Sequence, residues 1–171
     1  DFDDLLFNTD KLFKEHLEVL NKYQHKIHYV LVDEFQDTNL CQYYIIRKLA
    51  SVRENVCVVG DDAQSIYAFR GADISNILNF ERDYPDLRII KLEQNYRSTK
   101  NIVEAANSVI KKNRAQLPKN VWTENEEGQL IELIKALSDN EEGRLIASSI
   151  FEEKMQHQLS FSDFAVLYRT N

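Results

Sequence analysis

The sequence contains few residues that cross-link or break a chain: two cysteines, two prolines and four glycines among 171 positions. Cys41 and Cys57 lie far apart without metal-ligand spacing, which excludes a disulfide framework or an ordinary zinc site. Cys57 belongs to the apolar run 56–59, where we expect it to be a small core residue. No apolar run approaches the roughly 20 residues that cross a bilayer, and we expect no membrane partner.

The chain also lacks an initiator methionine and a signal peptide, since it begins Asp-Phe-Asp-Asp. We therefore expect a piece of a longer, cytoplasmic protein. The glycines stand at positions 60, 71, 128 and 143, so no Gly-x-x-x-x-Gly-Lys-Ser/Thr loop occurs. Without that loop the chain has neither the backbone cradle nor the lysine that hold nucleotide phosphates in P-loop proteins.

Positive charge is scarce overall but unevenly distributed. The net charge of −7 argues against a protein that coats nucleic acid unselectively. Between positions 97 and 120, however, six lysines and arginines accompany a single acidic residue, Glu104. This basic strip suits either the steering of a phosphate backbone or a solvated helix face, and the sequence leaves both interpretations open.

Short apolar runs alternate with helical patterns along the chain. We expect strands at 27–32, 55–59, 88–92, 129–136 and 164–168, and helices at the start of the chain and at 39–52, 74–84, 99–113 and 140–157. This alternation predicts an α/β fold with parallel sheets and right-handed crossovers. Pro85 ends one helical pattern and a new alternation follows it, which predicts domains at 1–86 and 87–171.

Two carboxylates, Asp33 and Glu34, directly follow the expected strand 27–32. A short β-branched run of this kind is typical of a strand buried on both faces. Its carboxyl end is where open α/β sheets bind ligands. Adjacent acids there suit a hydrated Mg²⁺ ion and a proton acceptor, as nucleotide hydrolysis requires. The plainer interpretation is an acidic helix N-terminus.

Five stretches occur in a characteristic order. They are Asp-Phe-Asp-Asp-Leu-Leu at 1–6, Asp-Glu-Phe-Gln-Asp-Thr-Asn at 33–39, Val-Gly-Asp-Asp-Ala-Gln-Ser-Ile-Tyr-Ala-Phe-Arg-Gly-Ala at 59–72, Leu-Glu-Gln-Asn-Tyr-Arg-Ser-Thr at 92–99, and Phe-Ala-Val-Leu-Tyr-Arg-Thr-Asn at 164–171. Together they resemble the UvrD/PcrA/Rep family of superfamily 1 DNA helicases over essentially the whole chain. The resemblance implies a motor that moves 3′→5′ on single-stranded DNA and hydrolyses ATP between two RecA-like domains of the P-loop NTPase type. The chain would then comprise the C-terminal half of the first domain and the N-terminal half of the second.

The resemblance also implies nucleotide-site roles for five residues. Asp33 matches the Walker B acid associated with Mg²⁺, and Glu34 matches the residue that activates the attacking water. Gln64 matches a glutamine that senses the γ-phosphate. Tyr96 matches the tyrosine that stacks on adenine, and Arg97 matches the arginine finger. Without the resemblance, we would interpret Arg97 as a solvated residue at the start of a helix.

A further set of residues matches positions that touch DNA. Tyr67, Phe69 and Arg70 match positions that contact single-stranded DNA or report its presence to the nucleotide. Aromatic rings suit this role because base stacking contributes about 1–3 kcal/mol per base without reading sequence. Many relatives carry tryptophan where this chain has Phe69, and core filling is the alternative for both rings.

Three more positions, Phe2, Arg169 and Asn171, match residues tied to the DNA path. The alternatives are that Phe2 is a hydrophobic staple and that Arg169 is an ordinary surface residue.

The sequence as a whole thus predicts the central part of an ATP-dependent DNA helicase, with ATP, Mg²⁺, single-stranded DNA, DNA junctions and the rest of the parent chain as partners. DNA repair or replication is the expected setting. Because the phosphate loop is missing, we predict that this chain alone is inactive. The alternatives are the helicase part of a helicase–nuclease, and a non-catalytic DNA- or protein-binding scaffold with a degenerate helicase fold.

Overall fold

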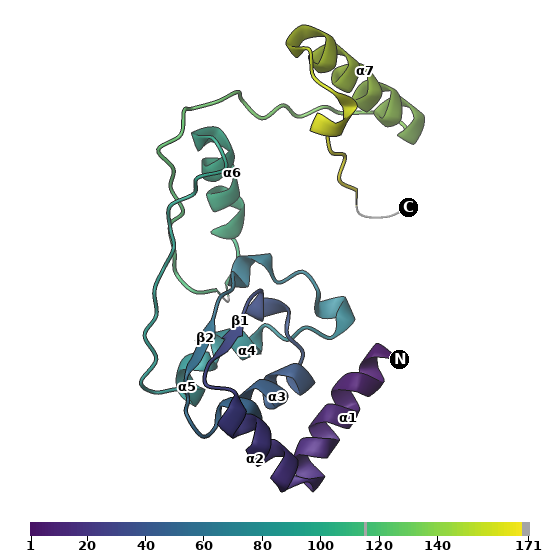
Figure 1. Ribbon diagram of the computed structural model, residues 1–171. Coiled ribbons are helices and arrows are strands. Elements are labelled where there is room, and N and C mark those ends of the chain that lie inside the picture. Colours follow the sequence, from purple (N-terminus) through teal and green to yellow (C-terminus); the bar gives the residue numbers. More distant parts are fainter. Residues whose placement is uncertain (115, 169–171) are drawn as a thin grey trace. The chain divides into compact units, whose positions relative to one another are not determined.

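The fold is taken from a computed structural model that describes residues 1–114 and 116–168 (Figure 1). The chain forms two compact units, residues 1–127 and 128–171, and each is described by itself. The first unit contains the helices α1 (Phe2–Glu15), α2 (Leu17–Lys26), α3 (Leu40–Ala50), α4 (Ser75–Leu78), α5 (Phe80–Asp83) and α6 (Lys100–Ile110), and the strands β1 (Val30–Val32) and β2 (Val56–Val58). It also contains the short 3₁₀ helices η1 (Phe35–Asp37), η2 (Asp62–Gln64) and η3 (Ala68–Arg70).

The two strands pair in parallel, with Leu31 opposite Cys57 at the centre of the ladder. The expected strands 27–32 and 55–59 are therefore confirmed, in shorter form. The sheet buries one face against the core. On the other face Cys57 is exposed, and Leu31 is 75% exposed. The prediction that β1 is buried on both faces was wrong, as was the prediction that Cys57 belongs to the core, because no described element covers that face.

The core of the first unit lies between the buried face of the sheet and α3, α4 and α5. Its centre is Phe35, which is fully buried and meets Phe80 edge to face at 5.2 Å between ring centroids. Tyr43 of α3 completes this cluster. Around the three rings pack the partly buried side chains of Val32, Ile46, Val56, Val58, Ile77, Tyr84 and Leu87. Phe35 immediately follows the Asp-Glu pair, so the packing of its ring fixes where those carboxylates stand.

Three helices form the remaining part of this core (Figure 1). The N-terminal helix expected from the sequence is two helices, because the backbone leaves the helical conformation at His16 (φ −125°, ψ 77°). The break lets α1 and α2 both pack on α3, burying Phe13 and Leu20. The side-chain amide of Gln24 donates to the Lys48 carbonyl at 2.6 Å, which joins α2 to the end of α3.

Helix α3 begins where the sequence predicts, because Asn39 and Gln42 form a reciprocal capping box. The Asn39 side chain accepts from the Gln42 amide, and the Gln42 side chain accepts from the Asn39 amide, both at 2.9 Å. Such caps typically contribute about 1 kcal/mol. The cap fixes the point at which the chain leaves the Asp33–Thr38 turn and enters α3.

The strands predicted at 88–92, 129–136 and 164–168 were wrong: among residues 1–114 and 116–168, these segments are irregular. A strand is stabilised by the hydrogen bonds of a neighbouring strand, and these runs find none among the described residues. The one pairing nearby is an isolated parallel bridge between Gln94 and Trp122. The helices predicted at 99–113 and 140–157 are confirmed as α6 and α7 (Asp139–His157).

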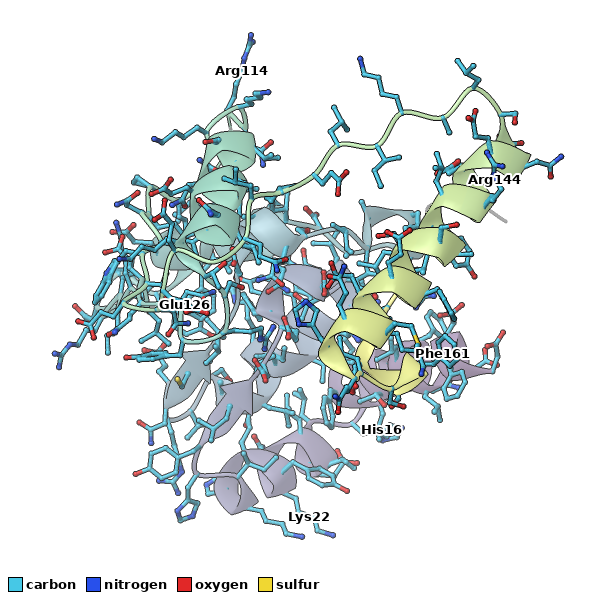
Figure 2. All side chains as sticks on the ribbon, turned by 90° about the horizontal axis from the view of Figure 1, so that it is seen from above. His16, Lys22, Arg114, Glu126, Arg144 and Phe161 are labelled. Atoms are coloured by element: carbon cyan, nitrogen blue, oxygen red, sulfur yellow. The ribbon has the colours of Figure 1, made fainter. Side chains whose placement is uncertain are left out.

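The second unit is built on α7 and the short helix η4 (Phe161–Asp163). Ser138 caps α7 by accepting from the Glu141 amide, and the Lys154 ammonium lies 5.1 Å from the centre of the Phe161 ring. Figure 2 shows an extended segment that leads to α7, and in this segment Leu130, Leu133 and Leu137 are exposed. In the described part of the chain, no helix has the length and apolar character needed to cross a membrane.

Candidate functional site

The turn after β1 holds the two predicted catalytic carboxylates. Asp33 and Glu34 are both exposed, and the Asp33 carboxylate accepts the Glu34 amide at 2.9 Å. Glu34 adopts the left-handed conformation (φ 49°, ψ 42°). A non-glycine residue held there costs on the order of 1–3 kcal/mol, and such residues cluster at functional sites. Glu34, which is predicted to activate water, is thus the strained residue of this turn; Glu54 and Gln158 have similar positive φ values elsewhere.

Gln36 connects this turn to the loop after β2. Its side-chain nitrogen donates to the Glu34 carboxylate at 2.8 Å, and its side-chain oxygen accepts the Asp61 amide at 3.0 Å. Gln36 is almost fully buried, so its own side chain is shielded from bulk water, while the Glu34 carboxylate that it bonds is exposed. Gly60 lets the Gln36 side chain come this close to the loop after β2, because a Cβ atom at position 60 would lie 2.7 Å from the Gln36 side-chain oxygen.

The predicted γ-phosphate sensor, Gln64, lies at the end of η2. Its side-chain nitrogen donates to the Asp61 carboxylate at 2.9 Å, and the same carboxylate caps η2 by accepting the Ala63 amide at 3.0 Å. Lys119 forms an ion pair with Asp61 and a second one, of 2.9 Å, with Asp62. Partial burial is the largest influence on the pKa of Asp61 and raises it. Hydrogen bonds from Lys119 and Gln64, with the lysine charge, outweigh burial and leave that pKa below its ordinary value.

The predicted DNA-contacting residues form an exposed cluster around η3. The Tyr67 and Phe69 rings lie 5.9 Å apart, and the Arg70 guanidinium lies 5.2 and 5.4 Å from their centres. Tyr67 is 37% exposed and Phe69 is 69% exposed, so the alternative that both rings fill the core is wrong. A guanidinium over aromatic faces presents a flat, cationic surface, which suits nucleobases and phosphates.

Tyr96 and Arg97 lie in a turn whose backbone is held by hydrogen bonds with the side chains of Asn95 and Asn125. The Asn95 carboxamide oxygen accepts the amides of Arg97 and Ser98 at 2.9 and 2.7 Å, and the Asn125 side chain donates to the carbonyls of Tyr96 and Ser98. Tyr96 and Arg97 are exposed. Among the described residues, the Arg97 guanidinium forms no ion pair. The turn therefore presents an aromatic ring and a cation from a fixed backbone.

The structure joins some of the predicted site residues and leaves others apart. Glu34 and Gln64 belong to one hydrogen-bonded network through Gln36 and Asp61. Phe2 is exposed at the start of α1 and belongs to no such network. The predictions for Arg169 and Asn171 lie outside the described residues.

Three residues of this network, Gln36, Asp61 and Lys119, were not predicted from the sequence. Gln36 stands inside the Asp-Glu-Phe-Gln-Asp motif, so its position was a signal that could have been used. Lys119 had no such signal beyond its membership of the basic strip, because its partners lie 57 and 58 residues earlier.

The donor chemistry after β1 fits Mg²⁺. In residues 1–114 and 116–168, no group of three or more histidine, cysteine or acidic side chains lies close enough to enclose a metal ion. Mg²⁺ does not require such a cage, because it keeps several waters and usually takes one or two protein carboxylates together with substrate phosphates. Asp33 and Glu34 supply exposed carboxylates of that kind.

Comparison with known families gives two matches that follow one another along the chain. Residues 1–85 match the model of the UvrD/REP helicase N-terminal domain, and residues 90–171 match that of the UvrD-like helicase C-terminal domain. Domains of this family imply a RecA-like α/β fold, and the mixed helices and small parallel sheet of this chain agree with it.

Individual relatives match over the full chain. An ATP-dependent DNA helicase PcrA from Bacillus subtilis (strain 168) is 53% identical over 171 residues, which is 100% of this chain and 23% of that protein. Helicases of the same name from Staphylococcus epidermidis (strain ATCC 12228 / FDA PCI 1200) and Staphylococcus aureus (strain Mu50 / ATCC 700699) are each 51% identical over 174 residues. They too are covered over 23% of their length, so the chain spans about a quarter of these relatives.

Proposed function

The chain belongs to the UvrD-like helicase family, and on that premise we propose that it is a segment of an ATP-dependent DNA helicase. The complete protein would move 3′→5′ along single-stranded DNA and separate duplexes or junctions, in DNA repair or replication. The cytoplasmic location expected from the sequence is part of the same proposal.

One observation supports this function above the others: the residue predicted to activate water is hydrogen-bonded into the loop of the residue predicted to sense phosphate. Glu34 stands in a strained turn, and buried Gln36 ties it to Asp61 and hence to Gln64. A scaffold protein has no chemical need for this arrangement. A hydrolase does, because its base and its phosphate contacts must keep a fixed geometry.

We assign the nucleotide chemistry to the residues in that network. Asp33 would hold Mg²⁺, which when bound neutralises charge on the phosphates. Glu34 would accept the proton of the attacking water, and Gln64 would bond the terminal phosphate. A phosphate loop is absent from residues 1–171, so another part of the protein would supply it.

The second side of the nucleotide site would come from the turn that holds Tyr96 and Arg97. Tyr96 would stack on adenine, and Arg97 would place its guanidinium against the transferring phosphate, an effect worth about 10³–10⁵ in rate. In this proposal the two residues lie in a second RecA-like domain, residues 87–171, and the acids lie in the first, residues 1–86. Closure of the two domains would then control hydrolysis.

The DNA path would follow the cluster of Tyr67, Phe69 and Arg70. These side chains are exposed and lie three to six residues beyond Gln64. Bases stacked on the rings would therefore be connected by a short stretch of backbone to the phosphate sensor. Phe2, Arg169 and Asn171 remain proposed contacts of the same path.

The test is DNA-stimulated ATP hydrolysis by the full-length protein. We expect Glu34→Gln to reduce turnover by about 10²–10⁴-fold while nucleotide binding persists, because general-base help is lost and the side chain keeps its size. The control is Glu81→Gln, which removes an exposed carboxylate of α5 outside the network.

Two results would contradict the proposal. Near-normal turnover by Glu34→Gln would show that Glu34 is not the residue that accepts the proton of the attacking water. A full-length wild type that binds DNA without hydrolysing ATP would favour the scaffold. Residues 1–171 alone should release no phosphate from ATP, because the loop that holds phosphates is missing from them.

A further inference from the structure

Lys119 links two parts of the first unit that are distant in sequence. Its ammonium bonds the carboxylates of both Asp61 and Asp62, and the Leu117 amide donates to the second oxygen of Asp62 at 2.7 Å. Asp62 is buried and the Lys119 side chain is 21% exposed, so their contact is largely withdrawn from water; the Asp61 side chain is 36% exposed, so its contact with Lys119 is only partly withdrawn. Charge pairs in such places hold geometry better than exposed pairs do.

The carboxylate that Lys119 holds is also the one that positions Gln64. One oxygen of Asp61 accepts Lys119 and the Ala63 amide, and the other accepts the Gln64 side chain. The orientation of that carboxylate therefore sets the orientation of the glutamine amide. Burial lowers the pKa of Lys119, but its hydrogen bonds to both aspartates outweigh burial and raise that pKa above its ordinary value.

The residues that follow Lys119 are hydrogen-bonded to the residues that precede Tyr96. Trp122 donates its amide to the Glu93 carbonyl at 2.9 Å and accepts the Asn95 amide at 2.7 Å. The Asn120 amide donates to the Glu93 carboxylate at 2.9 Å. Asn95 in turn fixes the amides of Arg97 and Ser98. A continuous set of bonds thus runs from Lys119 to the backbone of Arg97.

We propose that Lys119 is a positioning residue that sets the distance between the Arg97 turn and the Gln64 loop by holding Asp61 and Asp62 together. This inference rests on the proposed function, since it assigns Lys119 to the ATP site without contact with the nucleotide. Removal of the ammonium leaves two adjacent carboxylates to repel each other, one of them buried. The Gln64 side chain then loses its fixed acceptor.

The test compares full-length Lys119→Met with Lys119→Arg and with the control Lys22→Met, which removes an exposed lysine of α2 (Figure 2). We expect Lys119→Met to lower kcat for DNA-stimulated ATP hydrolysis roughly 10–100-fold, the effect of a small displacement of reacting groups. KM for ATP and the affinity for single-stranded DNA should stay close to wild type. Lys119→Arg should recover part of kcat, because it keeps the charge.

Hydrogen exchange in the same proteins tests the link without relying on hydrolysis. Exchange of the Ala63 amide should become faster in Lys119→Met and stay unchanged in Lys22→Met, because Asp61 is then free to turn away. Unchanged exchange at Ala63, or a kcat equal to that of Lys22→Met, overturns the inference. A loss of DNA affinity and of melting temperature in parallel with kcat also overturns it, since the pair would then be merely structural. A wild type without ATP hydrolysis would instead refute the proposed function, and exchange at Ala63 would still decide whether Lys119 fixes the loop.

Discussion

The two compact units respond differently to similar sequence patterns. Residues 1–127 convert two of their three short apolar runs into paired strands with a packed aromatic core and leave the run 88–92 unpaired, whereas residues 128–168 leave both of theirs, 129–136 and 164–168, unpaired. Leu31 and Leu133 both lie in runs that were predicted to be strands, and both side chains are exposed. Among the described residues, Leu31 belongs to a paired strand and Leu133 does not. The difference teaches that an apolar run specifies a strand only when another strand is available to receive its hydrogen bonds.

The largest expected effect is the loss of the aromatic core of the first unit, since the described residues of the second unit include no buried hydrophobic side chain. Phe35→Ala should lower the free energy of unfolding by about 3–5 kcal/mol, because it leaves a cavity beside Phe80 and Tyr43. Leu133→Ala in the second unit should change it by about 0.5 kcal/mol or less, because that side chain is already exposed. Urea unfolding followed by circular dichroism gives both values. Equal effects at the two positions would remove the contrast between the units.

A second comparison uses one glycine from each unit. In Gly60→Ala the new Cβ would meet the Gln36 side-chain oxygen at 2.7 Å and the Gln36 amide nitrogen at 3.3 Å, so we expect a cost of about 1–3 kcal/mol. In Gly143→Ala the new Cβ has open space within α7, so we expect a gain of about 0.5–1 kcal/mol. The same unfolding measurement checks the opposite signs. If Gly60→Ala left the free energy of unfolding unchanged, the Gln36 side chain would be able to move aside for the new methyl group.

The smallest expected effect compares a partly buried ion pair, Lys119 with Asp61, with an exposed carboxylate–imidazole contact. The pKa of Asp61 is held below its ordinary value of 3.8, so the stabilisation by Lys119 is present above that pH and is lost as the pH falls through the lower pKa of the folded state. The free energy of unfolding of wild type should therefore exceed that of Lys119→Met by about 1 kcal/mol or less at pH 7, and the difference should shrink as the pH falls below 3.8.

The matched control for that measurement lies in the second unit. Glu153 pairs with His157 at 3.5 Å along α7, with both side chains about half exposed. Glu153→Gln should alter stability at pH 7 by at most about 0.5 kcal/mol. A pH dependence of the Lys119 effect that runs in the opposite direction would show that Asp61 is not held as a carboxylate by the lysine.

Much of the local structure was predictable because its causes are local. The start of α3 depends on Asn39 and Gln42, three residues apart, and the start of α7 depends on Ser138 and Glu141, also three residues apart. The strands after Pro85 were not predictable in the same way, because pairing depends on residues far away in sequence. The exposure of Leu31 and Cys57 was missed for the same reason: burial of a second sheet face requires a covering element, and the run itself carries no information on it.

In the candidate site, too, local motifs were predictable from the sequence and contacts between distant residues were not. Family motifs predicted Glu34, Gln64 and Arg97 as separate points, and their roles stay predictions. The connections between them depend on bonds across 25 to 58 residues, from Gln36 to Asp61 and from Lys119 to the same residue. No periodicity or spacing rule describes such pairs. The left-handed backbone at Glu34 was equally unavailable, since glutamate has no preference for it.

The side-chain amide of Gln36 has a donor at one end and an acceptor at the other, a combination that few substitutions could reproduce. The nitrogen of this planar group donates a hydrogen bond to the Glu34 carboxylate, and its oxygen accepts one from the Asp61 peptide N–H. A glutamate there would set two anions against each other, and a methionine would leave a buried peptide N–H unsatisfied. Position 36 therefore behaves as a connector with a fixed direction, and even the isosteric exchange to glutamate should disconnect the two loops.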